Sequence, residues 1–189
     1  MRHMRFATLL LAGCVISAAP LATDAQAMEQ TVMVGGAAMY PSKNIVQNAV
    51  NSKDHTTLVA AVKAAGLADT LSGPGPFTVF APTNEAFAAL PPGTVDTLLN
   101  AENKGMLVKI LTYHVVSGRY TAADLMSLVR KGGGTAMLKT VEGEKLKLSM
   151  TGSNLLVSGE KGGASTVTIP NVTQSNGVIH VVNAVLLPN

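Results

Sequence analysis

The sequence has few of the side chains from which catalytic and cofactor sites are built. Cys14 is its single cysteine, and its 189 residues include no tryptophan, three tyrosines and four phenylalanines. If the N-terminal segment that holds Cys14 is removed, the chain loses every thiol nucleophile, cysteine metal ligand and redox pair. The scarcity of aromatic rings requires an aliphatic core and argues against a site that stacks sugar rings.

Charged residues are also scarce, at 13% of the chain, and no block of like charge occurs. The formal net charge of +3 includes Arg2 and Arg5 at the N-terminus, while the other basic residues are scattered among acidic ones. A nucleic-acid-binding protein needs a concentrated basic face, so we expect no nucleic-acid partner. The hydrophobic content of 47% is sufficient for a folded core, and the length suits one domain.

Residues 1–27 have the organisation of a secretory signal peptide. A basic start, MRHMR, precedes the uncharged segment Phe6–Thr23, and the small residues of Ala25-Gln26-Ala27 follow. We expect cleavage between Ala27 and Met28. The mature protein would then be exported to the periplasm, the medium or the cell surface.

Two alternatives for this segment stay open. Leu11-Ala12-Gly13-Cys14 resembles the lipobox of bacterial lipoproteins, in which a lipid on Cys14 would attach the protein to a membrane. Against lipidation, the apolar run continues beyond Cys14, where a polar tether is usual. The run of roughly 18 residues could also just span a bilayer, although Pro20 and many small residues make it a poor permanent anchor.

After the signal, residues 28–41 show little pattern and contain Gly35-Gly36, so we expect a flexible leader there. One domain should follow at 42–188. Its apolar residues recur first at helical spacing and, after Gly132, alternate as in β-strands, the longest such run being Val178–Leu187. Helices first and strands last indicate an α+β fold, not a nucleotide-binding βαβ fold.

Several polar residues occupy positions typical of helix ends. Ser52 or Asp54 can begin a helix that Gly66 ends. Thr121 with Asp124 matches an acidic variant of the capping box.

A short strand at Phe77–Phe80 leads into Thr83-Asn84-Glu85, where Thr83 or Asn84 can cap the next helix. Glu85 falls in the first turn, where a carboxylate is favoured by the helix dipole. Near the C-terminus, Asn176-Gly177 is a strong signal for a tight turn between two strands.

Three segments together resemble the signature regions of the fasciclin-like (FAS1) domain family. They are FTVFAPTNEAFAALP at 77–91, LVKILTYHVVSGRY at 107–120 and NGVIHVVNAVLLP at 176–188. Their order and spacing also agree with the family, and the resemblance covers about residues 42–188 in one copy. Asn183 is a departure, because the family often has aspartate there.

The resemblance implies a wedge of β-strands packed with several α-helices, in a secreted or surface-attached protein with no enzymatic activity, cofactor or metal. The family is often linked to adhesion or matrix contact. In some animal relatives a Tyr-His segment is associated with integrin-type binding, which makes Tyr113 and His114 candidate partner-binding residues.

The pattern of the residues themselves favours structural histidines. His114 lies on an apolar helical stripe, so we expect it to be buried and hydrogen-bonded, with Tyr113 free to present its ring at the surface. His180 lies in an alternating strand pattern and is expected to be structural. A zinc site from His55, His114 and His180 would need three separate elements to converge.

The corner at Thr83-Asn84-Glu85 could also hold a catalytic group, because strand-to-helix turns carry the nucleophile in many folds. A nucleophile needs a base within hydrogen-bond reach and a third group to orient that base. No histidine or lysine is nearby in the sequence, and helix capping accounts for all three residues. A hydrolase that uses Thr83 or Ser117 is therefore a third hypothesis.

The sequence favours an exported, non-catalytic module that contacts a surface or matrix protein or polysaccharide. The alternative is a periplasmic carrier or binder of a small ligand or polysaccharide, with a pocket in its aliphatic core.

Overall fold

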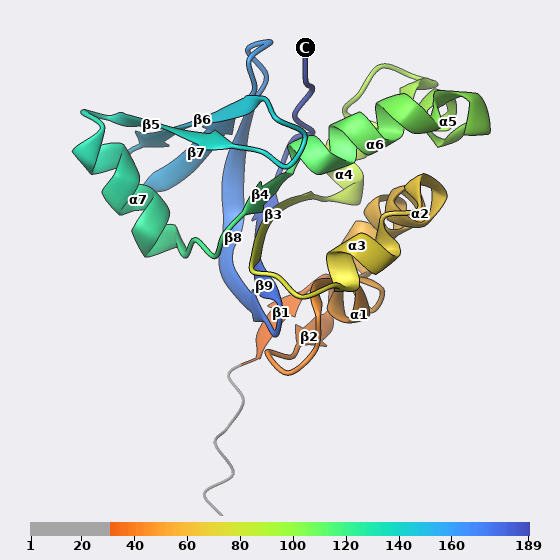
Figure 1. The fold of residues 1–189 in the computed structure, drawn as a ribbon, viewed down its shortest axis with the longest axis horizontal. Coiled ribbons are helices and arrows are strands. Elements are labelled where there is room, and N and C mark those ends of the chain that lie inside the picture. The colour runs from red at the N-terminus through yellow and green to blue at the C-terminus, as the bar shows by residue number, and fades with distance from the viewer. Residues whose placement is uncertain (1–30) are drawn as a thin grey trace, which may run out of the picture.

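The computed structural model describes residues 31–189, and Figure 1 shows how its elements are arranged. The expected signal peptide, the Ala27–Met28 cleavage site and Cys14 lie outside the described residues. Within residues 31–189, no helix is both long enough and apolar enough to cross a bilayer.

The first half of the described chain is mostly helical and the second half is mostly strands. The first half consists of β1 (Val32–Val34), β2 (Ala37–Met39), α1 (Ile45–Ala49), η1 (Lys53–His55), α2 (Thr56–Ala65), α3 (Ala68–Ser72), β3 (Phe77–Pro82), α4 (Asn84–Ala88), α5 (Thr94–Leu99), η2 (Ala101–Asn103), α6 (Lys104–Tyr113), β4 (Val115–Ser117) and α7 (Ala122–Lys131). The second half consists of β5 (Thr135–Lys139), β6 (Lys145–Thr151), β7 (Asn154–Ser158), β8 (Ala164–Gln174) and β9 (Gly177–Val182). This order confirms the α+β class.

Seven strands form one sheet in the order β4-β3-β9-β8-β7-β6-β5. β3 and β9 run parallel, with Phe77 opposite Gly177, and the other neighbouring pairs are antiparallel. The sheet bends until its two ends meet, because an isolated bridge joins Val116, in β4, to Thr140, just after β5. In Figure 1, α1–α6 lie on one side of β3 and β9, and α7 lies on the other side with β5 and β6.

Two hydrophobic clusters lie on opposite sides of β3 and β9. Val79 and Ile179 belong to the cluster that these strands share with α1, α2 and α6. Phe80 and Val182 belong to the cluster that they share with α7 and β5–β8. Because successive side chains of a strand point to opposite faces, both faces of these two strands are buried. Their sequences are therefore almost entirely apolar.

The structure corrects the flexible leader expected at 28–41, because residues 32–39 form an ordered hairpin. β1 and β2 pair across Gly35-Gly36, whose φ angles of 58° and 74° suit glycine. Val34 and Met39 are buried in the first hydrophobic cluster. Strands of three residues are too short to show an alternating pattern, which is why the sequence analysis missed the hairpin.

The boundaries around β9 also differ from those predicted. The run Val178–Leu187 is a strand only to the end of β9, and the longest strand is β8, with 11 residues. The turn lies one residue earlier than the Asn176-Gly177 signal suggests, because Ser175 and Asn176 form the loop. Position 177 requires glycine for a different reason. A Cβ atom there would lie 2.1 Å from the Phe77 carbonyl oxygen of β3, which is too close for any side chain.

Three helix ends are as predicted. The Thr83 hydroxyl accepts a hydrogen bond from the Ala86 amide at 3.3 Å and caps α4. Thr121 and Asp124 form a reciprocal capping box at the start of α7. Gly66 ends α2 in the left-handed conformation.

Asn84 caps a different helix from the one it begins. Its Oδ1 accepts a hydrogen bond from the Thr57 amide at 3.0 Å, and its Nδ2 donates to the Lys53 carbonyl at 2.7 Å. Asn84 therefore caps α2 from a distant part of the chain, whereas the sequence candidates Ser52 and Asp54 make no such bond. The corner after β3 thus fixes the position of α2 as well as the start of α4.

Asn176 joins the start of β9 to two helices. Its Oδ1 accepts a hydrogen bond from the Ile45 amide at 3.0 Å, at the start of α1. Its Nδ2 donates to the carbonyls of Leu71 and Gly73 at 2.8 and 2.9 Å, at the end of α3. One side chain therefore satisfies three main-chain groups that helix geometry leaves without a partner.

Replacing Asn176 with alanine is expected to lower the free energy of unfolding by about 3 kcal/mol, because three main-chain groups lose their partner. Urea denaturation of the purified protein measures this loss. Asn154→Ala is the matched control, since Asn154 is exposed and makes no side-chain hydrogen bond among the described residues. The control should change stability by less than about 0.5 kcal/mol. Equal losses in the two variants would contradict the role assigned to Asn176.

Candidate functional site

His114, a candidate for partner binding, is an internal residue with 2% of its surface exposed. Its Nε2 accepts a hydrogen bond from the Leu186 amide at 3.0 Å, so the proton of the neutral ring lies on Nδ1 and is donated to the Ile110 carbonyl at 2.8 Å. Burial lowers the pKa of His114 to about 4. The ring is therefore neutral at pH 7 and joins α6 to the C-terminal segment.

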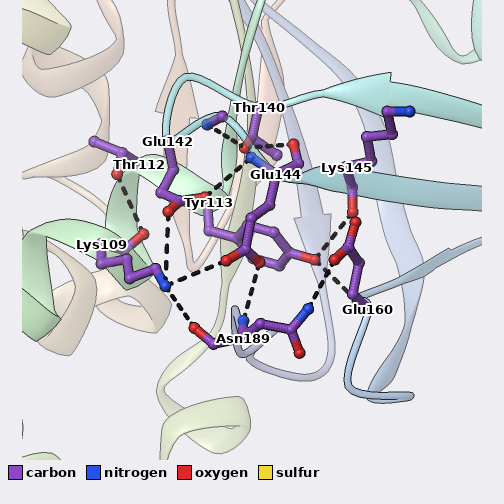
Figure 2. A network of polar contacts seen from close by, with 10 residues as sticks. Lys109, Thr112, Tyr113, Thr140, Glu142, Glu144, Lys145, Glu160 and Asn189 are labelled. Atoms are coloured by element: carbon purple, nitrogen blue, oxygen red, sulfur yellow. Dashed lines mark hydrogen bonds and ion pairs between the residues drawn. The ribbon is translucent and has the colours of Figure 1, made fainter.

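Tyr113 is also internal, which corrects the expectation that its ring is presented at the surface. The side chain is fully buried. Its hydroxyl donates to the Lys145 carbonyl and accepts from the Glu160 amide, both at 3.1 Å, as Figure 2 shows. Burial raises the pKa of Tyr113. Tyr113 and His114 therefore hold α6 against the sheet and are not a contact surface for a partner.

His180 is buried in β9, and both of its ring nitrogens have partners. Nδ1 accepts from the Asn171 amide at 3.3 Å, and Nε2 donates to the Tyr120 carbonyl at 2.9 Å. The ring also stacks on Phe80, with 5.8 Å between the ring centroids. This arrangement agrees with the structural histidine expected from the strand pattern.

Asn171 is a positioning residue that the sequence analysis missed. Its backbone is left-handed, with a φ angle of 59°, at an irregularity in the pairing of β8 with β9. Its Oδ1 accepts from the Ala122 amide at 2.7 Å, at the start of α7. Together, Asn171 and His180 fix the chain where it enters α7. An asparagine directly after Pro170, within a segment of strand-forming residues, is the signal that marks this bend.

His55 differs from His114 and His180. Its Nδ1 lies 2.9 Å from the Ser52 hydroxyl, while its buried Nε2 has no hydrogen-bond partner. Burial lowers the pKa of His55, and the main chain of Ala81, which lies close to the ring, opposes this effect. The three histidines make their hydrogen bonds in separate parts of the core. Among residues 31–189, no group of three or more histidine, cysteine or acidic residues is placed to hold a metal ion.

The candidate nucleophiles Thr83 and Ser117 have no base beside them. The hydrogen bonds made by the described histidine rings go to Ser52, Ile110, Leu186, Tyr120 and Asn171. Glu85 is exposed and makes no hydrogen bond to Thr83. Neither Thr83 nor Ser117 therefore has the adjacent base that a hydrolase nucleophile requires.

A network of charged groups surrounds the end of α6, as Figure 2 shows. The Lys109 ammonium lies 3.2 Å from a Glu144 oxygen and 3.8 Å from a Glu142 oxygen, and it donates to the main-chain oxygen of Asn189. The Asn189 amide donates to Glu144 at 2.9 Å, and its side chain donates to Glu160 at 2.7 Å. The Asn189 amide, with help from Lys109, lowers the pKa of Glu144. One ammonium group and the amides of Asn189 thus bridge three glutamates, and the network fastens the C-terminal segment to α6 and the sheet.

The outward side of the β5–β6 hairpin carries cations without such partners. Met137 pairs with Lys147 and Lys139 pairs with Lys145, so these four side chains project from one side of the hairpin. The alternate residues, including Leu138, are buried on the other side with α7. We call Met137, Lys139, Lys145 and Lys147 the lysine face. All four are exposed, and no ion pair involves these lysines among the described residues.

Asn183 keeps the function that aspartate could serve at the same place. Its Oδ1 accepts from the Thr166 amide at 2.8 Å and from the Ser165 hydroxyl at 3.3 Å. An aspartate oxygen can accept both bonds. The departure from the family pattern therefore preserves the link between β8 and the end of β9.

Comparison with known proteins gives three concordant results. A family model, the fasciclin domain, matches residues 53–188. Protein sll1483 of Synechocystis sp. is 46% identical over 166 residues, which cover 87% of this chain and 84% of that protein. Transforming growth factor-beta-induced protein ig-h3 of Sus scrofa is 34% identical over 176 residues, which cover 93% of this chain and 24% of that protein.

Among solved structures, the FAS1 domain pair of the insect cell adhesion molecule Fasciclin I matches with a TM-score of 0.69 at 19% identity. The match covers 77% of this chain and 51% of that chain. It confirms the wedge of strands and helices that the three signature segments imply.

The buried histidines predict that stability falls as the pH decreases from about 7 toward 4. An unfolded histidine binds a proton below about pH 6.5, whereas burial lowers the pKa of His55, His114 and His180 in the folded protein. The unfolded state therefore binds more protons in this window, and acidification lowers the free energy of unfolding. For His114 alone the loss approaches about 3 kcal/mol near pH 4. Urea denaturation at a series of pH values measures it.

His114→Phe tests the assignment of this effect. The variant should be less stable than the wild type at pH 7, because the Ile110 carbonyl and the Leu186 amide lose their partner. It should also lose less stability on acidification, because the titrating ring is gone. Parallel pH dependence in the variant and the wild type would show that His114 is not a source of the effect.

Proposed function

Because this chain belongs to the fasciclin domain family, we propose that it is an exported, non-catalytic module that contacts an acidic surface or matrix polymer through the lysine face. The observation that carries the proposal is the row of unpaired lysines on a sheet surface that no helix covers. Lys139, Lys145 and Lys147 share one side of two strands that carries no carboxylate, so their positive charge is available to a partner.

Several features support contact rather than catalysis. Candidate nucleophiles have no adjacent base, and the histidines are buried within the scaffold. The solved structure with the same fold comes from an insect cell adhesion molecule. A rigid sheet that presents fixed charges is suited to recognising a repeated, charged partner such as an acidic polysaccharide or protein.

Export is supported by the signal peptide pattern of residues 1–27. Contact with a membrane would arise through a lipid on Cys14 if that residue, rather than Met28, begins the mature chain. In either case a face of three exposed lysines gives weak contact that salt screens. Several copies gathered on one surface would hold a polymer much more firmly through avidity.

Replacing the three lysines of this face with glutamine is expected to weaken retention on an acidic polymer about tenfold or more, because the attraction comes from their charge. Co-sedimentation of the exported protein with alginate beads at low and high salt measures it. Wild-type retention should fall as salt increases, while retention of the variant should depend little on salt.

The matched control replaces Lys53, Lys63 and Lys104 with glutamine. These lysines are exposed on the helical side of the molecule, so the control makes the same change in net charge at another place. It should keep most of the wild-type retention. Equal loss in the two variants would mean that net charge alone acts, and would refute the lysine face as the contact surface.

A further inference from the structure

An apolar cavity of about 60 Å³ lies between the helices and the sheet. Its walls come from the β1–β2 hairpin, from α1, α2, α3 and α6, and from β3, β4, β8 and β9. Most of the lining side chains are aliphatic and belong to the first hydrophobic cluster. Because an apolar cavity stays dry and accepts apolar molecules, this one suits a hydrocarbon ligand.

The cavity opens between α1 and α2. Val46 and Ala49 of α1 and Val59 and Lys63 of α2 are the lining residues that are not buried. α1 packs against α3, whereas α2 packs against α4 and α6, so α1 and α2 are not packed closely on each other. Val50, one helical turn after Val46, is 47% exposed and continues the apolar surface of α1 outward. A ligand therefore has an apolar path into the cavity from this side.

Lys63 is the one charged residue of the lining, and no acidic residue contributes to it. It follows Val59 by one turn on the same side of α2. Lys63 is exposed, and it takes part in no ion pair among residues 31–189. The opening therefore combines hydrocarbon with one available positive charge, which complements an anionic group and disfavours a cationic one.

The inner part of the lining offers no charge to a ligand. Its polar side chains, Ser52, His55 and His114, are all buried. Ser52 and His55 bond to each other, and both ring nitrogens of His114 have main-chain partners. Burial lowers the pKa of both histidines, so neither ring is charged at pH 7. A charge without a partner is costly to bury, so the anionic group of a ligand belongs at the opening with Lys63.

The volume of the cavity restricts the ligand to a slender chain. A cavity that holds benzene measures about 150 Å³, so this smaller one has room for the end of an unbranched alkyl chain and not for a ring. The remainder of such a chain would lie in the opening, beside Val46 and Val50 of α1 and Val59 of α2.

We propose that this site binds a straight-chain fatty acid, with its methyl end in the cavity, its chain between α1 and α2, and its carboxylate paired with the Lys63 ammonium. The chain meets hydrocarbon along its length, and the carboxylate meets the one charge of the lining. Only the end of the chain is enclosed and the ion pair is exposed, so the affinity is modest. The site is separate from the lysine face and does not depend on it.

Octanoate tests the proposal in the exported, unmodified protein. It should raise the melting temperature in a saturable manner, because it binds the folded state. Its terminal methyl group, labelled with carbon-13, should show nuclear Overhauser contacts with the methyl groups of Val62 and Val79, which are buried lining residues. A melting temperature that does not rise, or a terminal methyl group that contacts neither valine at saturation, would overturn the proposal.

Lys63→Gln tests the position of the carboxylate. The variant should bind octanoate about fivefold more weakly, since an exposed ion pair is lost, and should bind 1-octanol as the wild type does. Lys131→Gln is the matched control, because Lys131 is also an exposed lysine in the last turn of a helix and lies outside the lining. It should bind octanoate normally. Equal weakening in the two variants, or octanoate binding that Lys63→Gln leaves unchanged, would refute the pairing.

Ala49→Leu tests the path of the chain. It places a larger side chain at the opening and should abolish octanoate binding. Ala60→Leu makes the same change at an exposed position of α2 outside the lining and should retain binding. If both variants bind octanoate equally, the chain does not enter between α1 and α2 and the proposal is wrong. Should Ala49→Leu fail to fold, the contacts of the terminal methyl group in the unmodified protein decide the question.

Discussion

The parallel pairing of β3 with β9 is the constraint on which the rest of the fold depends. The two strands are far apart in sequence, lie side by side in the sheet over six residue pairs and separate two hydrophobic clusters. Such close pairing requires glycine at position 177, where any side chain would meet the Phe77 carbonyl. Asn176, one residue earlier, extends the same junction to the ends of α1 and α3.

Several polar side chains in the family signatures stabilise the fold by hydrogen bonding to main-chain groups. Asn84 caps α2, His114 joins α6 to the C-terminal segment, and His180 holds the entry to α7. Each one satisfies buried or terminal backbone groups that would otherwise be unpaired. The segments that identify the family are therefore those that assemble the fold, and the lysine face proposed for contact lies outside them.

Two parts of the molecule have unused capacity for interaction, and they differ in chemistry. The lysine face offers positive charge on the outward side of the β5–β6 hairpin, whereas the cavity beside α1 and α2 is lined mostly by hydrocarbon. The first suits a large acidic polymer that binds weakly at many points. The walls of the cavity include the β1–β2 hairpin, which brings Val34 and Met39 into the core.

The sequence by itself determined the α+β order, the caps at Thr83 and Thr121, the stop at Gly66 and the burial of His114 and His180. These follow from periodicity and local hydrogen bonding, which act within a few residues. The tertiary structure decided the rest: the second partner of Asn84, the burial of Tyr113, the hairpin at 32–39, the shifted turn before Gly177 and the lysine face. The contacts of Asn84 and Tyr113 join positions that are far apart in the chain, and the spacing of residues along a sequence carries no record of them. The hairpin at 32–39 is local, but its strands are too short to show an alternating pattern.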